Sequence, residues 1–302
     1  MGKSVLRCAV ALALAAGAAG AGYQYAGEWP TATWCEGLDI NAVNGDVYVL
    51  VVYDVTYFTP DGSLLGSWDS GMPLCMPYAV ACSPAGNVYV SNVCPVDLDY
   101  IRYFTPAGSF LGQFVHTSWR EVYGMDFAAD GTLYATDEIN EMVWHCAPVG
   151  KLLDGWEGDF LAPKGVAVAP NGAVYVADTG NNTMKYYTAR GAYLGSWGGY
   201  GTGDGQFIQP WAVAVAADGT VFVVDRNNNR IQYFTSGGSF LGKFGSPGAG
   251  PGQLDRPTDV AVSLSGNRVY VSDTNNFRIQ YFDATNVNVQ PASLGKIRAL
   301  FR

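Results

Sequence analysis

The feature that most constrains this fold is a repeated pattern of short β runs separated by turns. The clearest copy is the stretch 210–245, in which four runs rich in Val, Ile, Phe and Tyr alternate with segments rich in Gly, Asp and Asn. Such side chains suit the pleated, half-buried surface of a strand, and Ala217-Asp218-Gly219 has the composition of a tight turn. The stretch predicts a four-stranded antiparallel meander that needs similar neighbours to bury its faces.

The pattern recurs along almost the whole chain. An aromatic residue marks the second run of each copy, at Tyr48, Tyr89, Tyr134, Tyr175, Phe222 and Tyr270. These positions are separated by 41, 45, 41, 47 and 48 residues. A period in the forties with four strands per copy is typical of a β-propeller, in which each copy forms one blade. Six copies predict an all-β fold, a six-bladed β-propeller of four-stranded antiparallel blades over residues 22–283.

The later copies resemble a known repeat family. The segment 203–210 (GDGQFIQP), followed by AVAV at 212–215, VFVVD at 221–225 and NRIQYF at 229–234, is similar to the NHL repeat, and so is the last copy, from Gly252 to Gln280. The first three copies carry eroded versions of these motifs. The resemblance implies a six-bladed propeller of a secreted, bacterial type, but it implies little about function because such scaffolds carry unrelated activities.

The two ends of the chain differ from the repeats. Residues 1–21 have a basic start, an apolar run too short to span a bilayer, and the small residues Ala19-Gly20-Ala21, which together are typical of a secretory signal peptide. We therefore expect a secreted, periplasmic or cell-surface protein without a transmembrane span. Residues 284–302 form a C-terminal tail with a basic, apolar end, which either packs on the propeller or acts as a sorting or anchoring segment.

Closure of the ring is predicted from the N-terminus. The last copy ends near Phe282 without a clear fourth run, whereas residues 25–29 (YAGEW) match the fourth run of another copy at 240–244 (FLGKF). We expect the N-terminal segment to form the outermost strand of the last blade, because closing the ring in this way removes exposed sheet edges.

The charge of the chain limits the choice of partner. It contains 17 Lys and Arg residues against 26 Asp and Glu residues, with a formal net charge of −9, and it has no basic run. Binding to nucleic acid depends largely on Lys and Arg contacts with phosphates, so no nucleic-acid partner is expected. The expected ligand is a protein, a peptide or a glycan, and the oligomeric state is left open.

A binding face is predicted at one mouth of the central channel. The innermost strands of a propeller surround this channel, and the residue at the start of each should lie at its rim: Glu36, Tyr78, Tyr123, Lys164, Trp211 and Thr258. The next position in each copy is mostly small, which indicates close packing there. Aromatic side chains with a few charges are typical of recognition surfaces. The alternative is that the aromatic residues only plug the channel.

Two Asp–Arg pairs flank the loop after the second run of the last two copies. They are Asp225 with Arg230 and Asp273 with Arg278. A charge-assisted hydrogen bond between the two side chains of a pair would brace the loop. We favour this structural role over a direct part in function.

Catalysis is the less favoured interpretation. A catalytic zinc site normally takes three protein ligands, often histidines, whereas this chain has only His116 and His145. The propeller lyase that cleaves hydroxyglycine peptides resembles this fold but uses several channel histidines. We therefore predict no metal site and no cofactor, although backbone oxygens in the channel could hold calcium. The alternatives to a binding module are a lyase or lactonase using acidic channel residues, and a structural component of an extracellular assembly.

Five cysteines remain after removal of the signal peptide, and export to an oxidising compartment permits disulfides. Cys82 and Cys146 are expected to be small buried thiols. Cys35, Cys75 and Cys94 are expected at one face of the first two blades. The preferred bridge is Cys75–Cys94, with Cys35 as the rival partner, and the odd number leaves at least one free thiol.

Overall fold

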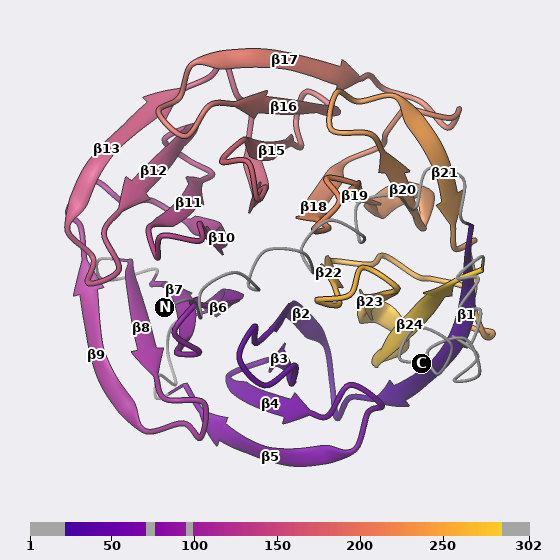
Figure 1. Cartoon of the computed structure of the whole chain (residues 1–302), viewed down its shortest axis with the longest axis horizontal. Coiled ribbons are helices and arrows are strands. Elements are labelled where there is room, and N and C mark those ends of the chain that lie inside the picture. Colours follow the sequence, from indigo (N-terminus) through magenta and orange to yellow (C-terminus); the bar gives the residue numbers. More distant parts are fainter. Residues whose placement is uncertain (1–21, 71–75, 95–98, 286–302) are drawn as a thin grey trace, which may run out of the picture.

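The protein is a six-bladed β-propeller in a computed structural model that describes residues 22–70, 76–94 and 99–285 (Figure 1). Six four-stranded sheets stand around a central axis, and each is an antiparallel meander whose first strand lies nearest that axis. The predicted all-β fold and number of blades are confirmed. No described helix is long and apolar enough to cross a membrane.

Each blade is built from strands of four to eight residues. Blade 1 contains β2 (Cys35–Ile40), β3 (Val47–Val51), β4 (Asp54–Phe58) and β5 (Leu64–Asp69), and blade 2 contains β6 (Met76–Cys82), β7 (Val88–Val93), β8 (Tyr100–Phe104) and β9 (Phe110–Val115). Blade 3 contains β10 (Val122–Phe127), β11 (Leu133–Asp137), β12 (Met142–Cys146) and β13 (Leu152–Glu157).

The second half of the ring repeats this arrangement. Blade 4 contains β14 (Pro163–Val168), β15 (Val174–Asp178), β16 (Thr183–Tyr187) and β17 (Tyr193–Gly198), and blade 5 contains β18 (Pro210–Val215), β19 (Val221–Asp225), β20 (Arg230–Phe234) and β21 (Phe240–Phe244). Blade 6 contains β22 (Asp259–Val262), β23 (Arg268–Asp273), β24 (Arg278–Ala284) and β1 (Tyr23–Pro30). Short 3-10 turns, η1 (Arg226–Asn228) and η2 (Thr274–Asn276), follow β19 and β23.

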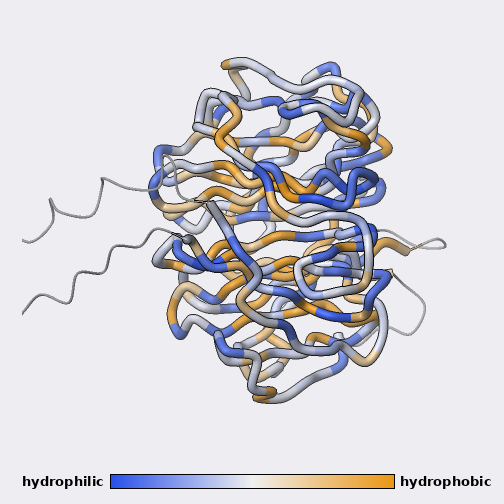
Figure 2. The backbone as a smooth tube through the Cα atoms, turned by 90° about the vertical axis from the view of Figure 1, so that its right-hand side faces the viewer, coloured by the Kyte–Doolittle hydropathy of each residue, from blue (hydrophilic) through white to orange (hydrophobic). Residues whose placement is uncertain are grey.

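The core lies between neighbouring blades. Every residue of β3, β11, β15 and β19 is buried, whereas β5, β9 and β17 at the perimeter alternate between exposed and half-buried positions. Figure 2 shows hydrophobic stretches running through the sheets and hydrophilic segments in the loops at their edges. A single blade cannot bury both faces, so the ring is stabilised by stacking blade on blade.

The aromatic residue that marks the repeats has a defined task. In five blades it is a tyrosine of the second strand whose hydroxyl donates to a carbonyl in the turn between the third and fourth strands of the next blade. The pairs are Tyr48 with Pro106, Tyr89 with Pro148, Tyr134 with Ala189, Tyr175 with Ser236 and Tyr270 with Pro60, at 2.8–3.1 Å. Each buried hydroxyl is thereby satisfied, and each blade is tied to its neighbour.

Blade 5 carries Phe222 instead of this tyrosine, and the topology explains why. The next blade takes its fourth strand from the N-terminus, so it has no hairpin turn between its third and fourth strands to accept a hydroxyl. Tyr23 of β1 packs edge-to-face on Phe222, with ring centroids 5.3 Å apart, and donates its own hydroxyl to the Gly266 carbonyl. An apolar ring at position 222 therefore fits the place where the ring closes.

Closure by the N-terminal strand is confirmed. β1 pairs antiparallel with β24, placing Tyr25 opposite Phe282 and Trp29 opposite Ile279. The indole of Trp29 is buried against Phe58 of blade 1, so this strand also joins the last blade to the first. The propeller extends slightly past the predicted boundary, since Thr285 N–H donates to the Gly22 carbonyl. The expected signal peptide and the rest of the C-terminal tail lie outside the described residues.

The cysteines agree with the prediction only in part. Cys35, Cys82 and Cys146 are free, buried thiols. Cys35 is therefore not a disulfide partner, and that alternative was wrong, because its Sγ lies inside the core and contacts the Arg278 carbonyl at 3.7 Å. Cys94 is disulfide-bonded. Its preferred partner, Cys75, lies outside the described residues, so the pairing itself stays a prediction.

Candidate functional site

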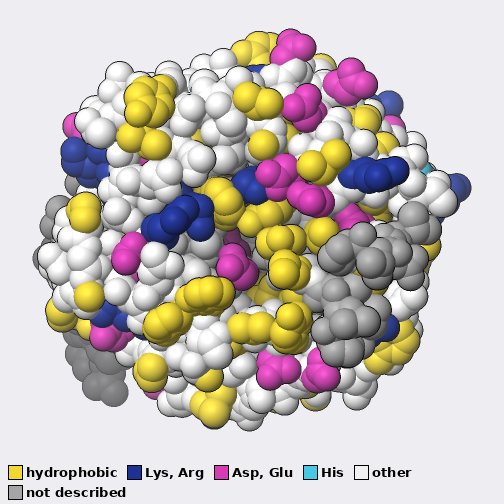
Figure 3. Space-filling model, turned by 180° about the vertical axis from the view of Figure 1, so that it is seen from behind, with side chains coloured by type: hydrophobic (Ala, Val, Ile, Leu, Met, Phe, Trp, Pro, Cys, Tyr) yellow, Lys and Arg dark blue, Asp and Glu magenta, His cyan; other side chains and the backbone are white. Residues whose placement is uncertain are grey.

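The candidate site is the central channel and its mouth at the start of the innermost strands. These strands enclose a cavity of about 160 Å³, which has room for several water molecules or one side chain. All six residues predicted for the rim line this cavity: Glu36, Tyr78, Tyr123, Lys164, Trp211 and Thr258. Figure 3 shows this face, with a hollow near its centre surrounded by hydrophobic, acidic and basic side chains.

Three aromatic rings form a collar on one side of the mouth. Tyr78 stacks on Tyr123 with ring centroids 4.3 Å apart, and Tyr123 meets Trp211 edge-to-face at 5.6 Å. The Lys164 ammonium lies 3.6 Å from the Tyr123 centroid and 4.4 Å from that of Trp211. This arrangement allows strong cation–π attraction. Residues from blades 2, 3, 4 and 5 thus hold one another in a preformed surface.

Two of the six predicted rim residues face inward and brace the ring. Lys164 is only 6 % exposed and pairs with Glu138 at 2.5 Å. Thr258 is 2 % exposed, and its hydroxyl donates to the carbonyls of Cys35 and Glu36 in the next blade. The other four, Glu36, Tyr78, Tyr123 and Trp211, are half-buried and remain open to the channel mouth. Their part in binding stays a prediction.

The small residues beside the rim are required by close approach of the inner strands. A Cβ added to Gly165 would lie 2.6 Å from the Ala212 Cα of the next blade, and one added to Gly124 would overlap the Lys164 carbonyl. Any larger side chain would push neighbouring blades apart. The alternation of a mixed rim position with a small one therefore has a steric cause.

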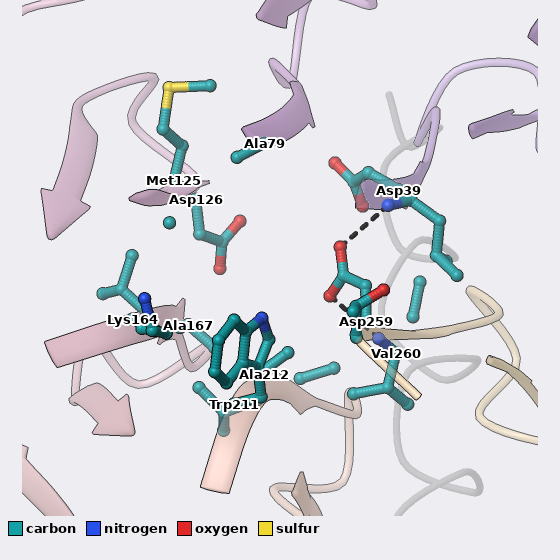
Figure 4. A pocket seen from close by; sticks show the side chains of 18 of the residues that line it. Asp39, Ala79, Met125, Asp126, Lys164, Ala167, Trp211, Ala212, Asp259 and Val260 are labelled. Carbon is teal, nitrogen blue, oxygen red and sulfur yellow. Dashed lines mark hydrogen bonds between the residues drawn. The ribbon is translucent and has the colours of Figure 1, made fainter. Parts of the chain in front are cut away.

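Three channel carboxylates were not predicted as site residues: Asp39, Asp126 and Asp259 (Figure 4). Each accepts one N–H from the following residue and one from the innermost strand of the next blade, at 2.7–2.8 Å. The signal available in the sequence was a polar residue inside an apolar inner run. Asp39 and Asp126 stand where the other copies have Ala81, Ala167, Ala214 and Ala261.

These carboxylates are costly to ionise. Burial raises the pKa of Asp39 to about 6, that of Asp126 to about 7 and that of Asp259 to about 8, and the backbone hydrogen bonds only partly oppose this effect. Asp39 further raises the pKa of the other two by charge repulsion. Burial also raises the pKa of Glu36 at the mouth, while Arg226 and Lys164 oppose the increase. Partly protonated carboxyl groups at neutral pH can act as general acids or bases.

A guanidinium completes the mouth. Arg226 belongs to η1, and its Cζ lies 3.9 Å from the centroid of the Trp211 ring. Its residue type gave no signal in the sequence because the position after the second strand varies between copies. Its location above Trp211 follows from the packing of the η1 turn against β18.

The residues of the two Asp–Arg pairs do not line the cavity. Arg230 Nε donates to Asp225 and Arg278 Nε to Asp273, both at 2.7 Å. The remaining nitrogens of Arg230 donate to the carbonyls of Thr202, Gly203 and Gln206, and thus hold the linker into blade 5. This geometry is that of a loop brace.

Neither His116 nor His145 lines the cavity. His145, on β12, pairs with Asp154 at 2.9 Å and stacks on Tyr134. His116 contacts the rings of Trp119 and Trp144. Within the described part of the chain, no group of three or more His, Cys, Asp or Glu side chains could hold a metal ion.

Taken together, these features define a six-bladed propeller with an aromatic collar over an acidic channel. The family model of the NHL repeat matches residues 160–185, 207–234 and 254–282, within blades 4, 5 and 6. These three segments therefore carry NHL repeats, and the six-bladed fold of the chain matches that of an NHL-repeat propeller. None of the curated proteins matches it.

Solved structures share the fold at low sequence identity. A streptogramin B lyase is 12 % identical, with a TM-score of 0.61, over 87 % of this chain and 98 % of the lyase. A catalytically inactive virginiamycin B lyase variant from Staphylococcus aureus, determined with quinupristin, is 15 % identical, with the same TM-score, over 87 % of this chain and 89 % of that protein. At this level of identity the likeness concerns the fold alone.

Proposed function

We propose that the protein is a non-catalytic binding module that recognises a protein partner with the face around the channel mouth. The observation that carries this proposal is the distribution of exposed apolar side chains. Of the eighteen large ones among the described residues, seven lie at the loops of this face: Trp34, Tyr53, Met76, Ile139, Leu161, Tyr200 and Phe277. Only three, Val43, Val149 and Leu264, lie at the loops of the opposite face.

The chemistry of this face favours a protein over a glycan. The exposed apolar side chains Met76, Ile139 and Leu161 lie on the same face as the collar, and apolar residues together with aromatic and charged anchors are typical of protein interfaces. The cavity of about 160 Å³ is sized for one inserted side chain. Tyr78, Tyr123 and Trp211 are the expected anchors, because Tyr and Trp are enriched among residues that dominate binding energy.

A lyase is the second candidate, and the channel carboxylates are the observation that favours it. The structural neighbours are lyases, and Asp126, with its pKa raised to about 7, has the properties of a general acid or base. Two facts favour binding instead. Each channel carboxylate already accepts two backbone N–H groups, and no histidine lines the cavity.

The location of the protein is part of the proposal. The basic start, apolar run and small residues within 1–21 support export through a signal peptide. In an oxidising compartment a Cys75–Cys94 bridge would be stable. Mass spectrometry of the native protein should find a terminus near Gly22, and an intact Met1 on the mature form would contradict export by this route.

The binding proposal is tested by quantitative capture of a partner from the native envelope, followed by affinity measurement with the purified pair. Trp211→Ala and Tyr78→Ala should each weaken binding by roughly 1 kcal/mol or more. Asn171→Ala and Asp218→Ala, on the opposite face, are the matched controls and should leave affinity unchanged. Binding that responds only to the control substitutions would show that the aromatic collar is a plug.

The lyase candidate is tested separately. Purified protein is incubated with quinupristin, with and without a chelator, and the compound is followed by mass spectrometry. Turnover that disappears in Asp126→Asn would favour catalysis over binding. An unchanged compound, together with a captured partner, is the result we expect.

A further inference from the structure

Arg226 is the one half-buried or buried cation in the described part of the chain whose side chain makes no hydrogen bond or ion pair. The other cations that are not exposed all have such partners: Arg102, Lys164, Lys185, Arg230, Arg268 and Arg278. Arg226 Nε is buried and has no acceptor. Native proteins rarely bury a donor in this way, because the lost hydration is not recovered.

The surroundings hold this guanidinium in place without neutralising it. Its Cζ lies 3.9 Å from the Trp211 ring centroid, so one flat face is covered by the indole. Burial lowers the pKa of Arg226, and the neighbouring Arg256 lowers it further. Tyr123 and Glu36 lie close enough to oppose this effect, yet none of the ion pairs among the described residues joins Glu36 to Arg226. Glu138, another acid beside the collar, is already paired with Lys164.

We propose that Arg226 binds a carboxylate of the protein partner, supplied by an Asp or Glu side chain or by a chain terminus. This inference rests on the proposed function and adds the chemistry of the ligand group. A guanidinium presents parallel N–H donors that match the two oxygens of a carboxylate. The Trp211 ring positions the fork, and the partner's carboxylate accepts from the terminal Nη groups, which, unlike Nε, are not among the buried atoms of the side chain.

The charges of the channel determine where this carboxylate can lie. Asp39, Asp126 and Asp259 line the cavity below the mouth. At neutral pH Asp39, with a pKa of about 6, is mostly ionised and Asp126, with a pKa of about 7, is partly ionised, so a negative group is repelled from the interior. The carboxylate is expected to stay at the rim, beside Trp211, while an apolar part of the partner meets the collar. The same acidic interior disfavours a group of higher negative charge, such as phosphate.

The first test uses sodium acetate as the probe and the chain that starts at residue 22. Arginine Nε–H resonances are followed by ¹H–¹⁵N NMR during titration with acetate, with sodium chloride at matched ionic strength and acetamide as references. One resonance, assigned to Arg226 by its absence in Arg226→Gln, should shift saturably with acetate alone. The matched control is Arg256→Gln, which removes an exposed neighbouring cation and should retain the shift.

The second test compares short peptides that differ in one group. Acetyl-Leu-Asp-Leu-amide should bind at least about tenfold more tightly than acetyl-Leu-Asn-Leu-amide to the wild type, and the two should bind equally to Arg226→Gln. The tripeptide acetyl-Leu-Leu-Leu with a free C-terminal carboxylate is compared with the same tripeptide carrying a C-terminal amide. Tighter binding of the free acid to the wild type would identify a chain end as a source of the carboxylate. The melting temperature of each variant is checked, because only a folded variant can be compared.

The outcomes separate the two proposals. An Arg226 resonance that does not respond to acetate, or responds equally to chloride, would overturn the carboxylate site even if a partner is captured. A partner whose binding depends on Trp211 but not on Arg226 would do the same. A saturable acetate shift without any captured partner would support the site and count against the proposed function.

Discussion

Blades 5 and 6 hold their connecting loops differently from blades 1 and 2, although all four have the same fold. In blade 5 the buried Asp225 accepts hydrogen bonds from the Ile208 N–H, Asn228, Arg230 and Gln232. At the same position blade 2 has Asn92 and blade 1 has Val51, an apolar residue. The carboxylate and its donors are therefore one way to hold a long linker, and the blade itself does not require them.

Blades 3 and 4 lie between these extremes. Asp178 pairs with Lys185 at 2.8 Å, and Asp137 accepts a hydrogen bond from the Trp144 indole at 2.9 Å. The carboxylate persists while its strongest donor changes from Arg to Lys to a neutral Trp. What all six blades keep is the apolar packing between sheets, which shows that blade stacking determines the fold and polar bracing adjusts the loops.

The largest loss of stability is expected where the N-terminal strand β1 closes the last blade. Deleting residues 23–30 removes β1, exposes the buried faces of Phe282 and Phe244, and removes Trp29 from its contact with Phe58. Loss of a buried Trp alone costs about 3–5 kcal/mol. The melting temperature should fall by roughly 10 °C or more, as measured by circular dichroism.

The control for this deletion is a substitution on the exposed side of the same strand. Gln24→Ala leaves the pairing with β24 intact and should change the melting temperature by little, since Gln24 is exposed. A deletion mutant that unfolds at the wild-type temperature would mean that β1 contributes little to closure.

The next effect compares the braces directly. Asp273→Ala leaves Arg278 buried without its main counter-charge, and removal of one partner of a buried ion pair costs about 3–5 kcal/mol. Asp137→Ala in blade 3 leaves only neutral donors unsatisfied, which costs about 1–3 kcal/mol. Urea unfolding measures the free energy of unfolding of both variants, and the two values can be compared if the m-values are equal.

The order of these two losses is the informative result. Equal losses would mean that Glu28, which contacts Arg278 at 2.9 Å, compensates for the missing carboxylate. A larger loss in blade 3 would contradict the view that the Asp–Arg brace is the stronger one.

The sequence was sufficient for the ring and for the residues at the mouth, but not for what those residues contact. The repeat period and the spare strand YAGEW at 25–29 predicted the six blades and their closure, because both depend on local pattern. That Lys164 turns inward to Glu138, whereas Arg226 remains unpaired, depends on contacts between blades, and the sequence does not encode these at a fixed spacing. Asp39, Asp126 and Asp259 were missed for the same reason: their hydrogen-bond partners belong to the next blade.

A smaller effect concerns pH and the three channel carboxylates. Their pKa values are raised by burial to about 6, 7 and 8, above the value near 3.9 of an unfolded chain. Between about pH 4 and pH 8 the folded state therefore binds more protons than the unfolded state, and the free energy of unfolding falls as pH rises. Their contribution is fully present below about pH 4 and is lost as pH rises through about 6 to 8. The melting temperature should decrease by roughly a few degrees between pH 5.5 and pH 9.

A variant assigns this dependence to the channel. Asp126→Asn cannot ionise, so its melting temperature should vary less with pH than that of the wild type. Asp218→Asn, at a turn of the opposite face, should keep the wild-type slope. A slope that is unaffected by Asp126→Asn would place the titrating groups elsewhere.

The smallest effect distinguishes blade 5 from the other five through a single hydroxyl. Tyr175 donates to the Ser236 carbonyl at 2.8 Å, so Tyr175→Phe should cost about 1 kcal/mol. The reverse change, Phe222→Tyr, adds a hydroxyl where the next blade has no hairpin turn to accept it and where Tyr23 already packs. A buried hydroxyl without a partner costs about 1–3 kcal/mol, so this change should also destabilise, although it restores the residue that the other blades use. Urea unfolding of both variants decides the point. If Phe222→Tyr stabilises the protein, the added hydroxyl finds an acceptor in blade 6, and the missing hairpin does not explain the phenylalanine.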